Sequence, residues 1–372
     1  MSLSNVTLHD VVSTLRAENL LNEGSATLEY LENRPDLQPW YIRTMVGFGA
    51  WLASLLLIGF VAGFSLAMDG GYALIGLVLI VAAILVRRHY DSDFLIQCAL
   101  ASSLAGQALV AYGFAETVGH DEFEIFLGFV LVVSSVLFFL FPDRIHRVIM
   151  VLLASGSLTT LFYVWEVNSL VPLLGPAFSG ALIFVHRQIP SLIASRYAAL
   201  VRPLMHGLML SAFGVLLIST VYVLPELGAE FQFYPRPWLS TILLGGLFLY
   251  IGTQIAQTIV NTANMTAILV IYGIMVVIIA CSWAAPGLLL GLIVVMLGAT
   301  SGNKTFIGAG IGFFAIFLAS YFYGIEVSML TKSITLIATG LAILLSRWAI
   351  LKLVATPGWR GSGHAETNAP SF

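Results

Sequence analysis

The chain has 372 residues, of which 59% are hydrophobic and 9% charged, and its formal net charge is −3. Soluble domains contain fewer apolar and more charged residues, so this composition excludes an ordinary soluble globular protein. The two cysteines, Cys98 and Cys281, both fall inside apolar runs. They predict neither a disulfide framework nor a CxxC metal site, and we interpret them as small buried hydrophobes.

Residues 1–44 predict a small cytosolic segment that contains short amphipathic helices. Apolar side chains recur there at helical spacing, and the segment opens with polar and acidic residues. This opening does not have the basic-then-apolar order of a signal peptide. Trp40, Tyr41 and Arg43 then predict an anchor at the membrane interface, where the chain would enter the lipid.

Long apolar runs follow, separated by short charged segments. At a rise of 1.5 Å per residue, about 20 apolar residues cross a hydrocarbon core of about 30 Å. The sequence therefore predicts an all-α integral membrane protein with about twelve transmembrane helices. The predicted spans are 45–67, 71–86, 94–115, 124–141, 148–165, 168–185, 203–224, 238–258, 265–283, 285–300, 305–323 and 327–346. The second and tenth spans are short, so the count is weakest there.

Charge placement predicts the orientation of these spans. If the N-terminus is inside, the cytoplasmic loops contain nearly all the arginines and lysines, and the outer loops contain acids. Basic residues resist translocation, so both termini are expected in the cytoplasm, with an even number of spans. Residues 187–202 predict an interfacial connector on the inner leaflet, and residues 347–372 predict a disordered cytosolic tail.

An internal similarity becomes visible when the chain is shifted by 160 residues. Phe162, Tyr163 and Glu166 then align with Phe322, Tyr323 and Glu326, without a gap across the last two spans of each half. Two parallel six-helix repeats, 45–186 and 203–346, would explain this alignment. Chance matching in low-complexity apolar sequence is the alternative, and the sequence leaves both open.

Three charged residues are candidates for a functional role. Lys332 lies inside the last predicted span, where a lysine is costly unless it faces a cavity or an acidic partner, or extends to the interface. Glu166 and Glu326 lie at matching outer hairpins, where each could serve as a gate or pair with Lys332. The alternative for both glutamates is a solvated acid near a helix end.

The histidines predict no metal site. His206, near the start of the seventh span, has a position suitable for a proton relay, although a satisfied core histidine is the stronger interpretation. His89, His146 and His186 lie beside arginines at predicted cytoplasmic ends and suggest a rim for anionic lipid headgroups. No catalytic or nucleotide-binding motif occurs in a suitable context, so we expect no enzymatic activity and no cofactor.

Several stretches resemble an uncharacterised family of bacterial inner-membrane proteins, catalogued as a domain of unknown function. The discriminating parts are PWY, SLAGQAL, PG, GN and a YxxxEVxxLxKS pattern, within a similarity that covers most of the chain after residue 39. The resemblance implies a location in the inner membrane. Similar proteins are often encoded beside a protein with a GDYxxLxY motif, which implies a membrane-associated partner.

Two functions remain open from the sequence. The scarcity of charge within the spans favours a non-enzymatic membrane protein that works with a membrane or periplasmic partner, and the aromatic outer loop 225–238 is a candidate docking surface. The alternative is a secondary transporter or permease for a small solute, favoured by twelve spans, the possible repeat and Lys332. The lipid bilayer is an expected contact, whereas nucleic acid is not.

Overall fold

The structure is a computed structural model of the whole chain, and it describes most of the region between residues 71 and 324. The described ranges are 71–90, 92–119, 122–195, 197–221, 237–259, 265–283 and 285–324, together with isolated positions in 45–63 and 330–344. Within these ranges the chain is helical and contains no strand.

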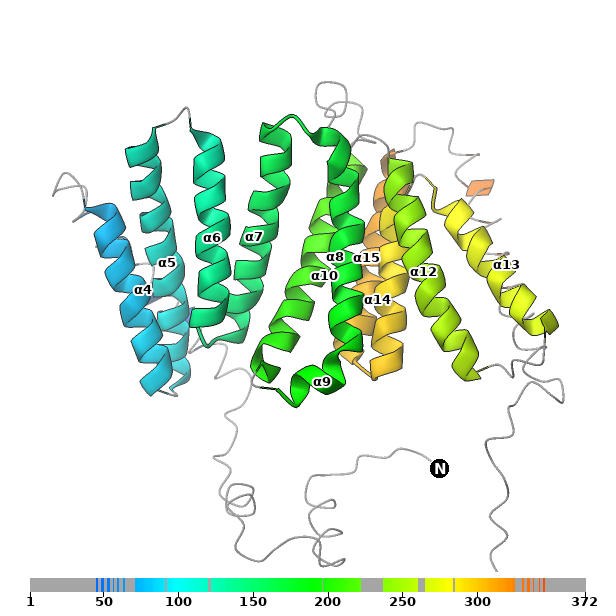
Figure 1. The fold of residues 1–372 in the computed structure, drawn as a ribbon, viewed down its shortest axis with the longest axis horizontal. Coiled ribbons are helices and arrows are strands. Elements are labelled where there is room, and N and C mark those ends of the chain that lie inside the picture. Colours follow the sequence, from blue (N-terminus) through cyan, green and yellow to red (C-terminus); the bar gives the residue numbers. More distant parts are fainter. Residues whose placement is uncertain are drawn as a thin grey trace, which may run out of the picture.

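The described helices run side by side, from α4 at one edge of the molecule to α13 at the other (Figure 1). They are α4 (Tyr72–His89), α5 (Asp93–Val118), α6 (Phe123–Leu140), α7 (Arg144–Val164), the 3₁₀ turn η1 (Asn168–Leu170), α8 (Val171–Arg187), α9 (Ile189–Ile193), α10 (Ala198–Val221), α12 (Pro237–Ile259), α13 (Met265–Cys281), α14 (Pro286–Ser301) and α15 (Lys304–Gly324).

These helices confirm a multi-pass membrane protein. Seven described helices are long and apolar enough to cross a bilayer, and three further apolar helices are shorter. Ten of the predicted spans coincide with described helices, including the short second and tenth spans, which form the separate helices α4 and α14. The predicted first span 45–67 and twelfth span 327–346 lie largely outside the described residues, so the number twelve stays a prediction.

The helices alternate in direction, and their charges separate to the two ends of the bundle (Figure 1). The ends of α4 and α8 and the beginnings of α7, α10 and α15 lie on the lower side of the view. These ends contain Arg87, Arg88, Arg144, Arg147, Arg187, Arg202 and Lys304. The opposite ends of α5, α6 and α7 contain Glu116, Glu122, Glu124 and Glu166. The described helices therefore have one basic end and one acidic end.

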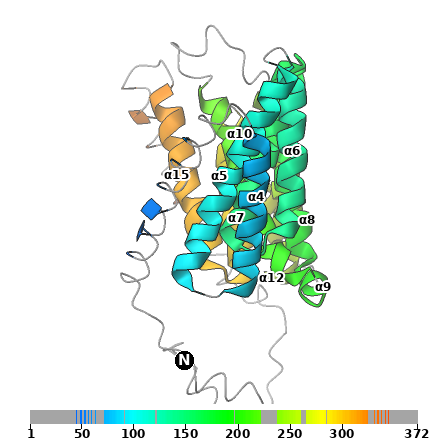
Figure 2. The same ribbon diagram turned by 90° about the vertical axis from the view of Figure 1, so that its left-hand side faces the viewer.

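Helix α10 lies among the other helices of the bundle (Figures 1 and 2), and the largest hydrophobic core surrounds it. This core joins α8, α10, α12, α14 and α15 through fully buried side chains such as Leu182, Phe213, Leu244 and Ile293. Helices α4 to α7 extend from one side of this core, with α7 packed against α10. Because no water is available in lipid to drive burial, close packing and polar contacts must hold these helices together.

Glycines allow two helical hairpins to pack backbone against backbone. In α4 and α5, a Cβ at Gly76 would lie 2.5 Å from the carbonyl oxygen of Gly106. In α14 and α15, a Cβ at Gly310 would lie 2.8 Å from the carbonyl oxygen of Gly291. Both distances are too short for any residue other than glycine without movement of the backbone. Small residues at helix interfaces are the usual means of close approach in membranes.

Two helices contain an internal proline whose effect is compensated by another helix. Pro176 of α8 has no N–H to donate to the carbonyl of Pro172, four residues earlier. Ser240 of α12 donates its hydroxyl to that carbonyl, at 2.6 Å, in a fully buried position. The tertiary contact thus replaces the hydrogen bond that the proline removes, as a membrane helix requires.

The seventh predicted span begins earlier than expected. The sequence places its start at Pro203, whereas α10 begins at Ala198 and contains Pro203 in its second turn. A proline is a reasonable helix start because its missing N–H costs nothing in the first turn. Here the carbonyl that Pro203 leaves free, that of Ala199, accepts a hydrogen bond from Arg147 of α7. A contact between distant residues therefore moves the helix start.

Candidate functional site

The four residues that the sequence singles out are not brought together in the described structure. Lys332 and Glu326 lie outside the described residues. Glu166 follows α7 at the acidic end of the bundle, and His206 lies near the beginning of α10 at the basic end. A role of Glu326 as a gate or as a partner of Lys332 therefore stays a hypothesis, as does any role of Lys332.

Glu166 has a structural role in ending α7. Its φ is +57°, a left-handed conformation that non-glycine residues rarely adopt. The N–H of Glu166 donates to the carbonyl of Tyr163, and the N–H of Val167 donates to that of Phe162. These two bonds form the Schellman motif that ends many helices. The Glu166 side chain is exposed, in agreement with a solvated acid at a helix end.

His206 makes a local contact within α10. Its Nδ1 donates to the carbonyl oxygen of Arg202, four residues earlier, at 2.7 Å. Its ring packs edge-on against Phe306 of α15, with ring centroids 5.2 Å apart. His206 is half-buried, so these contacts make it a satisfied histidine at the margin of the core, and neither contact supplies the acidic neighbour that a proton relay would use.

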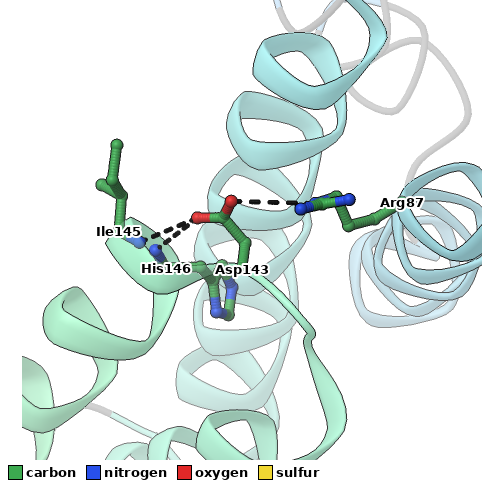
Figure 3. Close-up of polar contacts among 4 residues, drawn as sticks. All are labelled: Arg87, Asp143, Ile145 and His146. Carbon is green, nitrogen blue, oxygen red and sulfur yellow. Dashed lines mark hydrogen bonds and ion pairs between the residues drawn. The ribbon is translucent and has the colours of Figure 1, made fainter. Parts of the chain in front are cut away.

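A polar cluster instead surrounds the turn between α6 and α7 (Figure 3). Asp143 is the N-cap of α7, and its Oδ1 accepts hydrogen bonds from the N–H groups of Ile145 at 2.9 Å and His146 at 3.0 Å. Its other oxygen, Oδ2, lies 3.7 Å from Nε of Arg87 on α4. The Asp143 carboxylate thus caps the N-terminus of α7 through charge-assisted hydrogen bonds and also links α7 to α4.

His146 connects the same turn to the middle of α5. It is fully buried, and its ring stacks on Phe141 with centroids 4.1 Å apart. The Gln107 amide donates to Nε2 of His146 at 2.9 Å, and the Ser103 hydroxyl lies 3.0 Å from the same nitrogen. The turn therefore lies deeper in the bundle than the end of the α4–α5 hairpin, as Figure 1 also shows.

Arg147 satisfies two carbonyls that prolines leave free. Its Nε donates to the carbonyl oxygen of Phe138 at 3.1 Å, and its Nη1 donates to that of Ala199 at 3.3 Å. The residues four positions after these carbonyls are Pro142 and Pro203, and neither has an N–H. One buried guanidinium thus ends α6 and supports the proline inside α10. This arrangement explains how a charged side chain can be buried with no acidic partner at ion-pair distance among the described residues.

Two pockets lie beside the polar cluster. A pocket of about 510 Å³ lies between α5, α6 and α7, and Gln107, Ser134, Ser157 and Thr160 are its polar residues. A second pocket, of about 350 Å³, is lined by α6, α7, the end of α8 and the beginning of α10, and its lining is almost entirely apolar. No aspartate, glutamate, lysine, arginine, histidine or cysteine lines either of these two pockets. They suit apolar occupants better than ions.

The described residues offer no cluster of metal-binding side chains. No group of three or more histidine, cysteine, aspartate or glutamate side chains in this part of the chain is placed to hold a metal ion. In the polar cluster, each charged residue is engaged in a cap, an ion pair or a carbonyl contact. The polar cluster therefore has a structural role, because its polar contacts link α4, α5, α6, α7 and α10.

The prediction that His146 belongs to a rim for lipid headgroups is wrong. Its arginine neighbours suggested the membrane surface, but the residue is fully buried and bonded to α5. The signal that could have placed it is Asp143, an N-cap residue before Arg144, which begins α7 earlier than the predicted 148. The partner on α5 is Gln107, which bonds to His146 across the helix interface.

Many apolar helices of membrane-spanning length and two opposite charged ends define this molecule as a multi-pass helical membrane protein. The chain belongs to the family described as a domain of unknown function, DUF4401, whose profile matches residues 39–353. This match confirms the resemblance to an uncharacterised family. No curated protein and no solved structure matches the chain.

Proposed function

We propose that this protein is a non-enzymatic inner-membrane protein that works with a membrane or periplasmic partner and has both termini in the cytoplasm. The observation that carries the proposal is the lining of the two pockets, which contains no charged side chain. Proton- or ion-coupled transporters and membrane enzymes place ionisable groups where a substrate or ion passes. Here Arg87, Asp143 and Arg147, which lie beside the pockets, hold helices together.

The orientation rests on the basic end of the bundle. Seven arginines and lysines lie at the ends of α4 and α8 and at the beginnings of α7, α10 and α15. Basic residues of short loops remain on the cytoplasmic side because they resist translocation. The exposed glutamates at the other end would then face the periplasm, where they would be available to a periplasmic partner.

The partner that we propose is a membrane-associated protein with a GDYxxLxY motif, as the family resemblance implies. The aromatic loop 225–238, which lies almost entirely outside the described residues, is the proposed docking surface because an aromatic surface of this kind suits a protein interface. Affinity purification of the tagged protein from native membranes in mild detergent tests this proposal. A stoichiometric companion in mass spectrometry is the expected result, and a solitary monomer or dimer would contradict it.

A deletion variant tests whether loop 225–238 is the docking surface for this companion. Removal of residues 226–237 is expected to abolish co-purification while the membrane helices remain folded. The control replaces the same residues with a Gly/Ser linker of equal length, which preserves the connection between α10 and α12. Retention of the companion by both variants would exclude loop 225–238 as the docking surface.

The second candidate function is a secondary transporter or permease, and one observation favours it. Helices α7 and α15 begin at Arg144 and Lys304, which are 160 residues apart, and their N-caps match. Asp143 Oδ1 accepts from the N–H of Ile145 at 2.9 Å, and Asn303 Oδ1 accepts from that of Thr305 at 3.0 Å. This correspondence supports two parallel repeats, an architecture that many transporters have.

The transporter alternative depends on Lys332 and Glu326. If the protein transports a solute through a polar pathway that includes them, Lys332→Ala and Glu326→Gln should each abolish the phenotype of the wild-type gene in a complementation assay. Unchanged complementation by both variants, at equal protein level in the membrane, would remove the main residues of this alternative.

A further inference from the structure

We propose that the 350 Å³ pocket between α6, α7 and α10 binds one acyl chain of an anionic phospholipid, whose headgroup phosphate is held by the arginines at the beginning of α7. The pocket contributes the apolar half of this site and the α6–α7 turn contributes the charged half. The inference goes beyond the proposed function, because it assigns a ligand whether or not a protein partner is found.

The pocket has the lining that an acyl chain requires. Phe138 and Phe139 of α6, Met150 and Val151 of α7, and Leu204 of α10 are among its apolar residues. Its volume of about 350 Å³ is within the range of ligand pockets. Leu192 of the short helix α9, which begins directly after the end of α8, also lines it, so the pocket lies toward the basic end of the bundle.

The charged half of the site lies directly beside this lining. The guanidinium of Arg147 binds the carbonyl of Phe138, which lines the pocket, and that of Ala199, which precedes the lining residue Leu200. Arg144 is exposed and lies seven residues before Val151, so both residues are on the same face of α7. An amphiphile in the pocket would therefore have an arginine next to its headgroup.

The net charge of the turn favours an anionic headgroup. Asp143 is the one acidic residue between α6 and α7, and it already pairs with Arg87 of α4. Arg147 is only 9% exposed and bonds to two neutral carbonyls, whereas Arg144 is paired with no acid among the residues that the structure describes. Asp143 is also close enough to act on Arg147 electrostatically, so this one carboxylate is shared by Arg87 and Arg147. Three arginines around one carboxylate leave the turn with a net positive charge, which Arg144 carries at the surface. Basic pockets between membrane helices recognise anionic lipid headgroups for this reason.

Native mass spectrometry of the purified full-length protein in detergent tests the proposal, with phosphatidylglycerol and phosphatidylcholine of identical acyl chains as probes. We expect one tightly bound phosphatidylglycerol, and roughly tenfold weaker binding of phosphatidylcholine, because the charged half of the site favours an anionic headgroup. Equal affinity for the two lipids would overturn the charged half of the site. This comparison uses the wild-type protein, so it does not depend on the folding of any variant.

Two matched pairs of variants locate the site. Arg144→Gln should weaken phosphatidylglycerol binding about fivefold, since a basic residue near the headgroup contributes about that factor. Lys304→Gln, at the exposed beginning of α15, should leave it unchanged. Ser135→Trp, which fills the pocket, should abolish binding, whereas Val136→Trp at the next, exposed position outside the lining should not. Equal effects within either pair would overturn the assignment to this pocket.

Discussion

Among single residues, Arg147 shows how a membrane protein can use a charged side chain in a structural role. Its guanidinium donates to the carbonyls of Phe138 and Ala199, which lack partners because Pro142 and Pro203 have no N–H. A buried carbonyl without a donor costs about 1–3 kcal/mol. The charged side chain is retained because its donors are arranged in a fork that can reach two helices at once.

We therefore expect Arg147→Met to lower the free energy of unfolding by about 1–3 kcal/mol, measured by titration with a denaturing detergent in mixed micelles. The loss should be smaller when Pro203→Ala is already present, because that substitution restores an N–H that can donate to the carbonyl of Ala199. Arg88→Met, at an exposed arginine of α4, is the control and should change stability little. An equal loss with and without Pro203→Ala would contradict the assigned role.

At the scale of helices, prolines and glycines determine which pairs of helices must touch. Pro176 creates a free carbonyl at Pro172 that Ser240 of α12 satisfies. Ser240→Ala should therefore destabilise the protein by about 0.5–2 kcal/mol. In a Pro176→Ala background the same change should cost clearly less, since the restored N–H would donate to that carbonyl within α8. A double-mutant cycle of unfolding free energies measures the difference, and a coupling of zero would contradict this explanation.

The packing of α14 against α15 gives a second test at this scale. Gly310→Ala should destabilise the protein by about 1–3 kcal/mol because its Cβ would lie 2.8 Å from the carbonyl oxygen of Gly291. Gly308→Ala, two residues earlier and with no atom within 4 Å of its Cβ, should be neutral or slightly stabilising. Thermal unfolding in detergent compares the two variants. The interface would be wrongly assigned if both variants unfolded alike.

Much of the helix pattern could be predicted from the sequence, whereas the polar cluster could not. Apolar runs of membrane-spanning length determine where α4 to α8 lie, because the bilayer fixes the length that each helix needs. The start of α10 and the burial of His146 depend instead on contacts with residues far away in the chain, Arg147 and Gln107. The residues next to Pro203 and His146 in the sequence do not reveal these distant partners. Pro203 therefore suggested a helix start, and His146 suggested a rim for lipid headgroups.

At the scale of the whole molecule, the separation of charge relates the fold to the membrane. The exposed residues Arg88, Arg144 and Lys304 lie at one end of the bundle, and the exposed residues Glu122 and Glu166 lie at the other. The proposed orientation, the lipid site at the α6–α7 turn and the periplasmic position of loop 225–238 all require that these ends face opposite sides of the membrane.

Cysteine accessibility in intact cells tests whether the two ends of the bundle face opposite sides of the membrane. In a variant that has Cys98 and Cys281 replaced by serine, single cysteines are introduced at Arg88, Arg144, Lys304 and Glu166 and treated with a membrane-impermeant maleimide. The orientation predicts labelling of Glu166→Cys in intact cells, and labelling of the other three only after the inner membrane is opened. Labelling of Glu166→Cys from the same side as Arg144→Cys would contradict it.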